Sequence, residues 1–272
     1  MPELPEIETI RLSLGPLVLG QKIITVDIRQ FMLRFPVRKE EIEKWVVGQK
    51  INAIDRRAKY LIFRLANEAS LIFHLGMSGR LGLYKPHEKA ENHTHIILSL
   101  ANGRQIRYRD PRRFGFIEVV QPSEMYFRFF RLGYEPLSTS FDGFCLFEKT
   151  RTSRRTIKTL LMDSTFVVGI GNIYANEALF LAEIDPQRIA ASLNEDECHR
   201  LVGAVKTTLK KAIAKGGTTL NDFRDALGEP GFFQLELAVY GREKKMCIRC
   251  GEAIRRTVQG NRSTFYCPRC QL

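Results

Sequence analysis

The first ten residues, MPELPEIETI, can supply a nucleophile that belongs to no side chain. If Met1 is removed, which a small second residue permits, Pro2 becomes a free secondary amine. An α-amino group, with a pKa of about 7.7–8.0, is neutral in roughly a tenth of molecules at pH 7, far more often than an unperturbed lysine amine. Its adduct with a carbonyl carbon is an iminium, which stays positively charged at any pH and acts as an electron sink. Pro2 is therefore a candidate for covalent catalysis.

Glu3 follows this amine directly, where a carboxyl group can move protons to and from a bound substrate. The same stretch also has the features of an ordinary helix. Pro5 suits a first helical turn, and Ile7 and Ile10 recur at helical spacing. A capped N-terminal helix without a catalytic role is therefore the alternative for these residues taken alone.

Four of the six cysteines lie in the last 26 residues, as two Cys-x2-Cys pairs separated by 16 residues. This spacing is typical of a four-thiolate zinc site, and a disulfide framework fits a reducing cytosol less well. The predicted zinc ligands are Cys247, Cys250, Cys267 and Cys270. Cys145 and Cys198 are isolated, and we expect them to be small hydrophobic residues rather than reactive thiols.

The chain of 272 residues is strongly basic, with 42 Lys and Arg against 30 Asp and Glu, a net charge of +12 and a pI near 9.6. Such a surplus favours a polyanionic partner, most often nucleic acid, with a membrane surface as the rival. Because there is no apolar run of about 18 residues and no basic segment leading into an apolar one, we expect neither a transmembrane helix nor a signal peptide. The expected location is the cytoplasm.

Residues 21–120 alternate in a way that predicts short antiparallel strands, and so a sandwich or barrel. Asn102-Gly103 predicts a two-residue hairpin turn between two of them. The predicted strands are 22–28, 51–65, 71–75, 94–100, 105–108 and 116–120.

The pattern changes to helical after residues 129–143, a stretch with turn residues and no period, which we take as the boundary. Helices are predicted over 144–162, 172–182 and 194–215. Ser192 and Glu195 are a possible capping box for the last, which stops at Gly216-Gly217. Residues 216–239 are too long for a simple connection, and such segments are often mobile functional loops.

Asn172 follows two glycines in the sequence GIGNIY, at the start of a predicted helix. Glycines allow a ligand to approach the backbone, and a helix N-terminus attracts phosphate. A glycine turn with an Asn cap accounts for the same residues equally well.

Met77 and Phe114 lie in two glycine-containing stretches, HLGMSG and DPRRFG, that follow predicted strands. Apolar side chains beside arginines, here Arg112 and Arg113, are used by proteins that open a DNA base step. Met and Phe are more often core residues, so their exposure decides between the two interpretations.

Taken together, these residues resemble the bacterial formamidopyrimidine-DNA glycosylases, which repair 8-oxoguanine. The resemblance runs from end to end and rests on motifs in the same order: the PELPE start, RAKYL at 57–61, residues 74–79, 110–115 and 169–174, YGR at 240–242, and the terminal cysteines. It implies an α+β multidomain fold: an N-terminal β-sandwich with a flanking helix, a helix–two-turn–helix domain and a C-terminal β-hairpin zinc finger. The expected domains are 1–128, a linker 129–143, 144–239 with a lesion-capping loop at 216–233, and 240–272.

The resemblance also implies roles for individual residues. Pro2 would attack C1′ of the damaged nucleotide, Glu3 would protonate the opened sugar oxygen, and Lys59 would contact phosphate and help base release. Arg262 would act with Asn172 to pinch the flanking phosphates, although Gly260-Asn261-Arg262 has one residue more than the usual Gly-Arg. The residues expected to contact DNA are His74, Met77, His93, Arg112, Phe114, Lys158, Asn172 and Tyr240.

The expected activity is excision of oxidised purines from duplex DNA, preferably opposite cytosine, followed by β,δ-elimination at the abasic site. A single Zn²⁺ would be structural, because all four of its ligands are protein thiolates. The protein is expected to be a monomer associated with the nucleoid. The alternatives are a glycosylase for oxidised pyrimidines resembling endonuclease VIII, and a non-catalytic zinc-finger DNA-binding protein.

Overall fold

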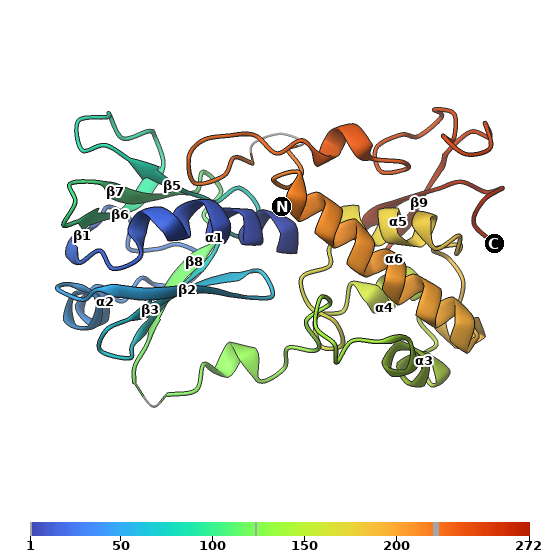
Figure 1. Cartoon of the computed structure of the whole chain (residues 1–272), viewed down its shortest axis with the longest axis horizontal. Helices are drawn as coiled ribbons and strands as arrows, with labels where there is room; N and C mark the ends of the chain where they lie inside the picture. Colours follow the sequence, from blue (N-terminus) through green and yellow to red (C-terminus); the bar gives the residue numbers. More distant parts are fainter. Residues whose placement is uncertain (1, 123, 220–222) are drawn as a thin grey trace. The chain divides into compact units, whose positions relative to one another are not determined.

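A computed structural model describes residues 2–122, 124–219 and 223–272, and the chain in it forms two compact units (Figure 1). The first unit comprises residues 1–127 together with 215–232, and the second comprises 128–214 together with 233–272. Of this second segment, the described residues 215–219 and 223–232 thus pack with the sandwich rather than with their sequence neighbours. The predicted functional domain boundaries remain predictions.

The first unit contains two four-stranded antiparallel sheets. One sheet has the order β1-β6-β7-β5, with β1 Ile23–Ile28, β6 Thr94–Leu100, β7 Gln105–Arg109 and β5 Arg80–Tyr84. The other has the order β2-β3-β4-β8, with β2 Ile51–Arg57, β3 Tyr60–Leu65, β4 Ser70–His74 and β8 Phe116–Val120. Apolar side chains from both sheets, such as Phe63, Phe73 and Ile106, form one buried cluster. The predicted α+β fold with an N-terminal β-sandwich is confirmed.

Helix α1 (Leu4–Val18) packs against β2 and β3 of one sheet and β5 of the other, and so closes one side of the sandwich (Figure 1). Ile7, Ile10 and Leu14 are fully buried, because residues at these spacings share one face of a helix. The shorter helix α2 (Lys39–Val46) packs against β1 and β8. The helix that begins two residues after Pro2 is therefore anchored in the core.

Three details of the sandwich differ from the prediction. The single strand predicted over 51–65 is a hairpin, because Ala58 has φ 53° and reverses the chain between β2 and β3. The loop at Asn102-Gly103 has three residues, since Leu100 N–H donates to Arg104 C=O and Gly103 has φ 78°. Strand β5 was not predicted, because Gly82 interrupts its short alternating pattern.

The second unit is built from α3 (Gly143–Arg151), α4 (Ile157–Leu161), α5 (Asn172–Leu181) and α6 (Glu195–Ala214). The single helix predicted over 144–162 is divided into α3 and α4. The backbone between the two helices pairs with residues 188–190 instead: Ile157 N–H donates to Arg188 C=O, and Ala190 N–H donates to Arg155 C=O. A backbone that pairs with another segment cannot also continue a helical ladder.

The N-terminus of α6 is capped two residues later than predicted. Asn194 accepts the N–H of Glu197 at 2.8 Å, and the Glu197 carboxylate accepts the N–H of Asn194 at 2.9 Å. The capping box is therefore Asn194–Glu197 and not Ser192–Glu195.

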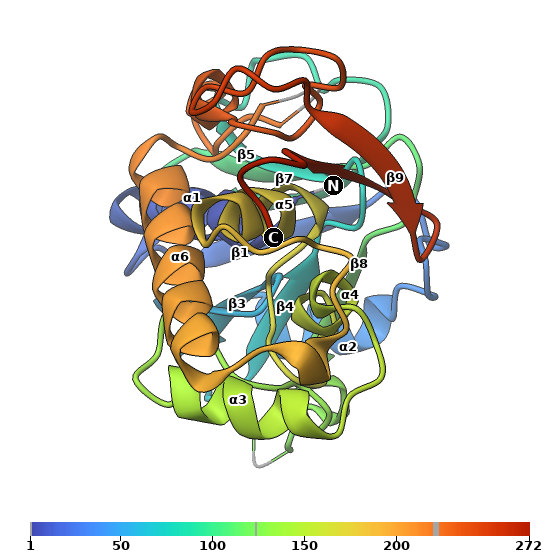
Figure 2. The ribbon, with the colours of Figure 1, turned by 90° about the vertical axis from the view of Figure 1, so that its right-hand side faces the viewer.

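A two-stranded hairpin, β9 (Arg255–Gln259) and β10 (Arg262–Tyr266), completes the second unit, with α5 packed against β10 (Figure 2). Short 3-10 turns lie at Phe127–Phe129, Ala190–Ser192 and Phe233–Glu236. Among the residues described, none of the helices has the length and apolar character that crossing a bilayer requires.

Candidate functional site

Pro2 and Glu3 are held at the start of α1 by a reciprocal capping box. The Glu3 side chain accepts the backbone N–H of Glu6, and the Glu6 carboxylate accepts the N–H of Glu3 at 2.7 Å. Pro2 is buried, and Glu3 is only 3% exposed. The position of the predicted nucleophile is therefore tied to the helix by the residue that follows it.

Glu6 also joins α1 to the segment that begins at Lys215. Its second carboxylate oxygen accepts the N–H of Thr218 at 2.8 Å. Gly217 has φ 82°, and a Cβ there would approach that carboxylate oxygen to 3.0 Å. The start of the predicted lesion-capping loop is thus attached to the helix of the predicted nucleophile, while residues 220–222 lie outside the described part of the chain.

Lys59, the predicted catalytic lysine, lies in the tight turn between β2 and β3 and is half-buried. Arg56 donates to the carbonyl oxygen of Ala58 in that turn at 3.1 Å. Arg56 also pairs with Glu8 of α1 at 2.9 Å. This chain of contacts links the turn that carries Lys59 to the helix that follows Pro2.

The predicted wedge residues line one groove in the first unit, of about 720 Å³. We call it the wedge groove; its lining includes His74, Met77, Arg112 and Phe114. Met77 is 43% exposed and Phe114 is 44% exposed, so neither is a core residue. The guanidinium of Arg112 lies over the Phe114 ring at 4.7 Å from its centroid, a cation–π contact. Their exposure favours the wedge interpretation of the sequence.

A buried carboxylate, Asp110, holds the loop that carries these side chains. It is fully buried and accepts hydrogen bonds from the Ser78 hydroxyl at 2.6 Å, the Tyr108 hydroxyl at 3.1 Å and the Gly115 N–H at 2.8 Å. Burial, together with the charge of Asp110 and its hydrogen bond, raises the pKa of Tyr108 well above its ordinary value, so Tyr108 remains a donor at neutral pH. Asp110 therefore satisfies three donors that would otherwise be buried without partners.

Glycine is required where the two wedge-bearing loops touch. Gly76 has φ 62°, and a Cβ there would clash with the backbone of Phe114 and Gly115. A Cβ at Gly115 would clash with the Tyr108 hydroxyl. Glycine at these two positions therefore allows the backbones of the two wedge-bearing loops to lie in contact.

Each of the two predicted DNA-binding histidines contacts one of these loops. His74 accepts the Gly76 N–H at Nδ1 (3.1 Å), which places the proton of the neutral ring on Nε2, a donor suited to a phosphate oxygen. Its ring stacks on Phe116 at 5.2 Å. His93 is exposed with φ 67°, and its carbonyl accepts the N–H of Asp110 at 3.1 Å.

In the second unit, two predicted DNA contacts converge on the carbonyl oxygen of Ser263 in β10. Lys158 donates to it at 3.0 Å and to the Thr264 hydroxyl at 2.7 Å, and Asn172 donates to it through its amide at 2.9 Å. Lys158 is only 1% exposed, so in this structure it holds the hairpin instead of facing solvent. The Asn172 amide nitrogen carries a second hydrogen for another acceptor.

Arg262, the residue next to Ser263, is exposed at the first position of β10. Gly260 and Asn261 have φ 54° and 59°, so they form a two-residue turn of the type that joins tightly paired strands. The additional residue noted in the sequence is accommodated in this turn.

Sequence reasoning missed two residues of α5, one of which holds the hairpin and the other the segment that leads into the zinc finger. The Asn176 side-chain oxygen accepts the N–H of Phe265 at 2.8 Å. The Glu177 carboxylate accepts the N–H groups of Ala238, Val239 and Tyr240 at 2.8–3.0 Å. Polar residues inside the otherwise apolar stretch NIYANEALFL are the signal that could have revealed them.

Tyr240, a further predicted DNA contact, is therefore placed by Glu177. Its ring also meets Phe265 of β10 edge to face, with centroids 5.2 Å apart.

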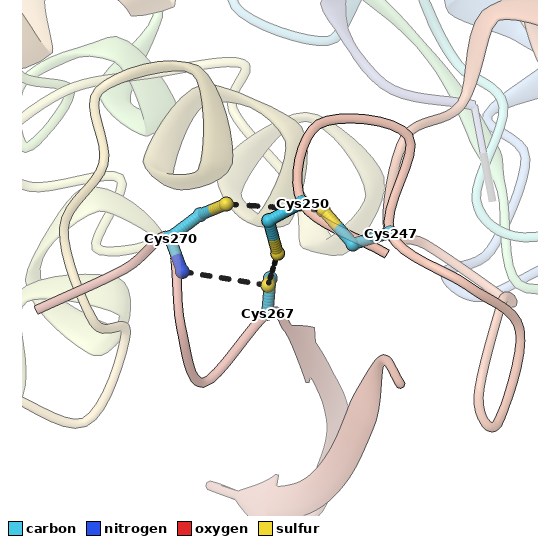
Figure 3. A group of neighbouring side chains, drawn as sticks. All are labelled: Cys247, Cys250, Cys267 and Cys270. Carbon is cyan, nitrogen blue, oxygen red and sulfur yellow. Dashed lines mark hydrogen bonds between the residues drawn. The ribbon is translucent and has the colours of Figure 1, made fainter. Parts of the chain in front are cut away.

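The four terminal cysteines form one cluster, with their sulfur atoms all within 4.8 Å of one another (Figure 3). The Sγ atoms of Cys247 and Cys270 are 3.9 Å apart, and those of Cys250 and Cys267 are 3.4 Å apart. A tetrahedral site with Zn–S bonds of about 2.3 Å requires sulfur atoms about 3.8 Å apart. The cluster therefore fits one structural zinc ion, as predicted.

The other two cysteines lie outside this cluster. Cys198 is fully buried, and burial raises the pKa of its thiol to about 11, in keeping with an unreactive core residue.

Family models cover most of the chain. The formamidopyrimidine-DNA glycosylase N-terminal domain matches residues 1–117, its H2TH domain matches 132–224, and a zinc finger found in FPG and IleRS matches 244–272.

Curated relatives and solved structures agree with these models. The chain is 46% identical to the formamidopyrimidine-DNA glycosylase of Laribacter hongkongensis and 47% identical to that of Halorhodospira halophila, with 100% of each chain covered. A Lactococcus lactis FPG variant in complex with a Fapy-dG containing DNA has a TM-score of 0.92 at 37% identity, with 99% of both chains covered. Because these matches span its whole length, the chain belongs to the formamidopyrimidine-DNA glycosylase family.

Proposed function

We propose that this protein excises oxidised purines, such as 8-oxoguanine and formamidopyrimidines, from duplex DNA and then cleaves the strand at the abasic site through a Schiff base on Pro2. The base-excision glycosylase activity follows from family membership. The observation that carries the proposed chemistry is that Pro2 and Glu3 stand together at the capped start of α1. DNA binding without catalysis receives no support from the family match. Excision of oxidised pyrimidines stays an alternative, because one solved structure of the Lactococcus lactis FPG is a complex with an oxidized pyrimidine containing DNA.

The reaction begins, after loss of Met1, when the lone pair of the Pro2 nitrogen attacks C1′ of an extruded nucleotide. The C1′–N9 bond breaks, and the base leaves with a proton. Glu3 protonates the sugar O4′ as the ring opens, leaving an iminium between Pro2 and C1′. Loss of a C2′ proton expels the 3′ phosphate, and a second elimination expels the 5′ phosphate. Base removal and strand cleavage thus share one covalent intermediate.

The contacts that hold the nucleotide in place are also proposals. His74, His93, Lys59 and Tyr240 would donate to phosphates. A phosphate pinch by Arg262 and Asn172 is supported by the exposure of Arg262 and by the Asn172 hydrogen bond to its neighbour Ser263. Met77 and Phe114 would occupy the space left by the extruded base. Lys158 would support the same phosphate contacts indirectly, because it holds β10, the strand that carries Arg262.

Arg112 would face the unpaired base, which we propose to be cytosine. Its stacking on Phe114 leaves the guanidinium donors at the edge of the wedge groove, where they can bond the base acceptors. Cys247, Cys250, Cys267 and Cys270 would hold a zinc ion that stabilises the finger, and four thiolate ligands would leave no open position for chemistry on the metal. We further propose that the protein acts as a monomer in the cytoplasm, at the nucleoid, with the functional domains 1–128, 144–239 and 240–272.

Borohydride trapping tests the proposal. Purified protein is incubated with a duplex carrying one 8-oxoguanine opposite cytosine, beside duplexes with dihydrothymine or no lesion. We expect a covalent adduct on the 8-oxoguanine strand that maps to the N-terminal peptide, and none with Pro2→Gly. An adduct formed only on dihydrothymine would move the substrate to oxidised pyrimidines. No adduct from protein shown to lack Met1 would refute the catalytic proposal.

A further inference from the structure

The wedge groove is also lined by a loop, residues 31–37, to which none of the sequence motifs assigned a function. Met32 and Arg34 of this loop line the groove together with the wedges. Met32 is 54% exposed, whereas Leu33 and Val37 are 5% and 6% exposed and anchor the loop in the core. The loop therefore presents Met32 and Arg34 to the groove from a fixed base, and Phe31 is exposed outside the groove lining.

This loop is physically joined to the loop that carries Phe114. The backbone N–H of Arg34 donates to the carbonyl oxygen of Gly115 at 3.1 Å. The ring of Phe35 packs edge to face on Phe116, with centroids 5.2 Å apart. The loop is closed on itself by the N–H of Val37, which donates to Phe31 C=O at 2.9 Å. Because of these contacts, the loop 31–37 and the loop that carries Phe114 form one preorganised surface.

The charges around the groove favour a polyanion. Its lining includes three guanidinium groups, from Arg34, Arg112 and Arg113, and contains no carboxylate. Within the described residues Arg34 has no salt bridge, and its guanidinium lies over the Phe35 ring at 5.6 Å. Nearby Arg29 differs, because its guanidinium is paired with Asp27 at 2.7 Å. An apolar wall beside unpaired arginines suits stacked bases and their phosphates.

We infer that the loop 31–37 is a second DNA-binding element, which holds the strand opposite the damaged nucleotide. Arg34 pairs with a phosphate of that strand, and Met32 packs against the adjoining sugar and base. The choice of strand rests on the proposed function, in which Arg112 faces the unpaired base. The N–H of Arg34 donates to the carbonyl oxygen of Gly115, so Arg34 is close to the loop that carries Arg112, and this closeness favours the strand that Arg112 would face.

The first test compares two arginine deletions with the same change in charge, Arg34→Ala and Arg29→Ala. Binding to the lesion duplex is measured over a range of salt concentrations. Loss of one phosphate contact reduces the slope of log K against log salt by about 0.9 and weakens binding by roughly 3–10-fold. We expect this change for Arg34→Ala only. Equal slopes for the two variants would overturn the assignment.

The second test identifies the strand. Single phosphates are replaced by neutral methylphosphonates, either in the damaged strand or in the opposite strand. If Arg34 pairs with the opposite strand, one neutral linkage there weakens wild-type binding but has little further effect on Arg34→Ala, as in a double-mutant cycle. Coupling to a linkage in the damaged strand, or to none, would refute the inference.

Met32 is tested by Met32→Ala with Met32→Leu as its matched control. Met32→Ala should weaken binding without changing the salt slope, because only apolar contact is lost, and Met32→Leu should restore the affinity. Circular dichroism and thermal unfolding exclude misfolding of either variant. Failure of wild-type trapping would instead refute the proposed function, so the two failures are distinguishable.

Discussion

The hydroxyl of Ser78 donates to the buried carboxylate of Asp110 at 2.6 Å and accepts the backbone N–H of Arg112 at 3.3 Å. One side chain thus connects the loop that carries Met77 with the loop that carries Phe114. The wedges are therefore positioned before any DNA arrives, which reduces the entropy lost on binding.

Asp110→Asn should destabilise the protein and disorganise the wedges. In the asparagine, one of the two oxygens becomes an NH2 group, which cannot accept a hydrogen bond. If it replaces Oδ2, the Gly115 N–H and the Tyr108 hydroxyl lose their acceptor; if it replaces Oδ1, the Ser78 hydroxyl does. Leaving a buried donor without a partner costs about 1–3 kcal/mol. Chemical denaturation should show this loss, and base release should slow. Ser140→Ala, which removes an exposed hydroxyl bonded only to Ser138, is the control and should be nearly neutral.

Glu177→Gln should loosen the attachment to α5 of residues 238–240, which pack in the same cluster as Cys247 and Cys267. The Glu177 carboxylate accepts three backbone N–H groups, and a glutamine would present a donor to at least one of them. We expect faster release of zinc to a colorimetric chelator and weaker binding of lesion DNA. Glu183→Gln removes an exposed partner of Arg249, which lies between Cys247 and Cys250, and serves as the comparison. Equal rates of zinc release in both variants would contradict the anchoring role.

Glu8 should make the stability of the first unit depend on pH. Burial acts to raise the pKa of Glu8, but Arg11 and Arg56 together outweigh it and lower the pKa below the ordinary value of 4.5. A carboxyl group with a lowered pKa in the folded state stabilises the protein above its unfolded pKa, and this stabilisation is lost as the pH falls through the folded pKa.

The matching measurement is thermal unfolding of wild type and Glu8→Gln from neutral to acidic pH. Wild type should be more stable at pH 7, and the difference should disappear below the folded pKa of Glu8. Base release should also slow in Glu8→Gln at neutral pH, because Arg56 orients the turn that carries Lys59. A difference that persists unchanged into acid would exclude the ion pair as its cause.

Removal of zinc should unfold the hairpin and leave the sandwich intact. The cluster packed around Cys247, Cys267 and Phe265 is small, so it depends on the metal for its stability. Treatment with a strong chelator, or Cys250→Ser, should abolish binding to lesion DNA. The first unit should keep its cooperative unfolding transition, observed by the fluorescence of Trp45, which packs against its core. Loss of both transitions together would show that the units are not independent.

The sequence alone determined the features that depend on local spacing and on residue chemistry. The two Cys-x2-Cys pairs specified the zinc site, and the Pro2-Glu3 start specified the candidate nucleophile. Alternation indicated the stretches that form the sandwich strands, except for β5 and for the turn between β2 and β3. These signals survive because each depends on a few neighbouring residues, whatever the rest of the chain does.

Only the tertiary structure decided the features that depend on distant backbone groups. Helix 144–162 is broken because Arg155 and Ile157 pair with residues 188–190, and Glu177 gained its role from three N–H groups about 60 residues away. The exposure of Met77, the burial of Lys158 and the closeness of Arg34 to Phe114 are likewise outcomes of packing. The periodicity of a sequence segment cannot predict such contacts, because their energy comes from residues that are distant in the sequence and meet only in the folded chain.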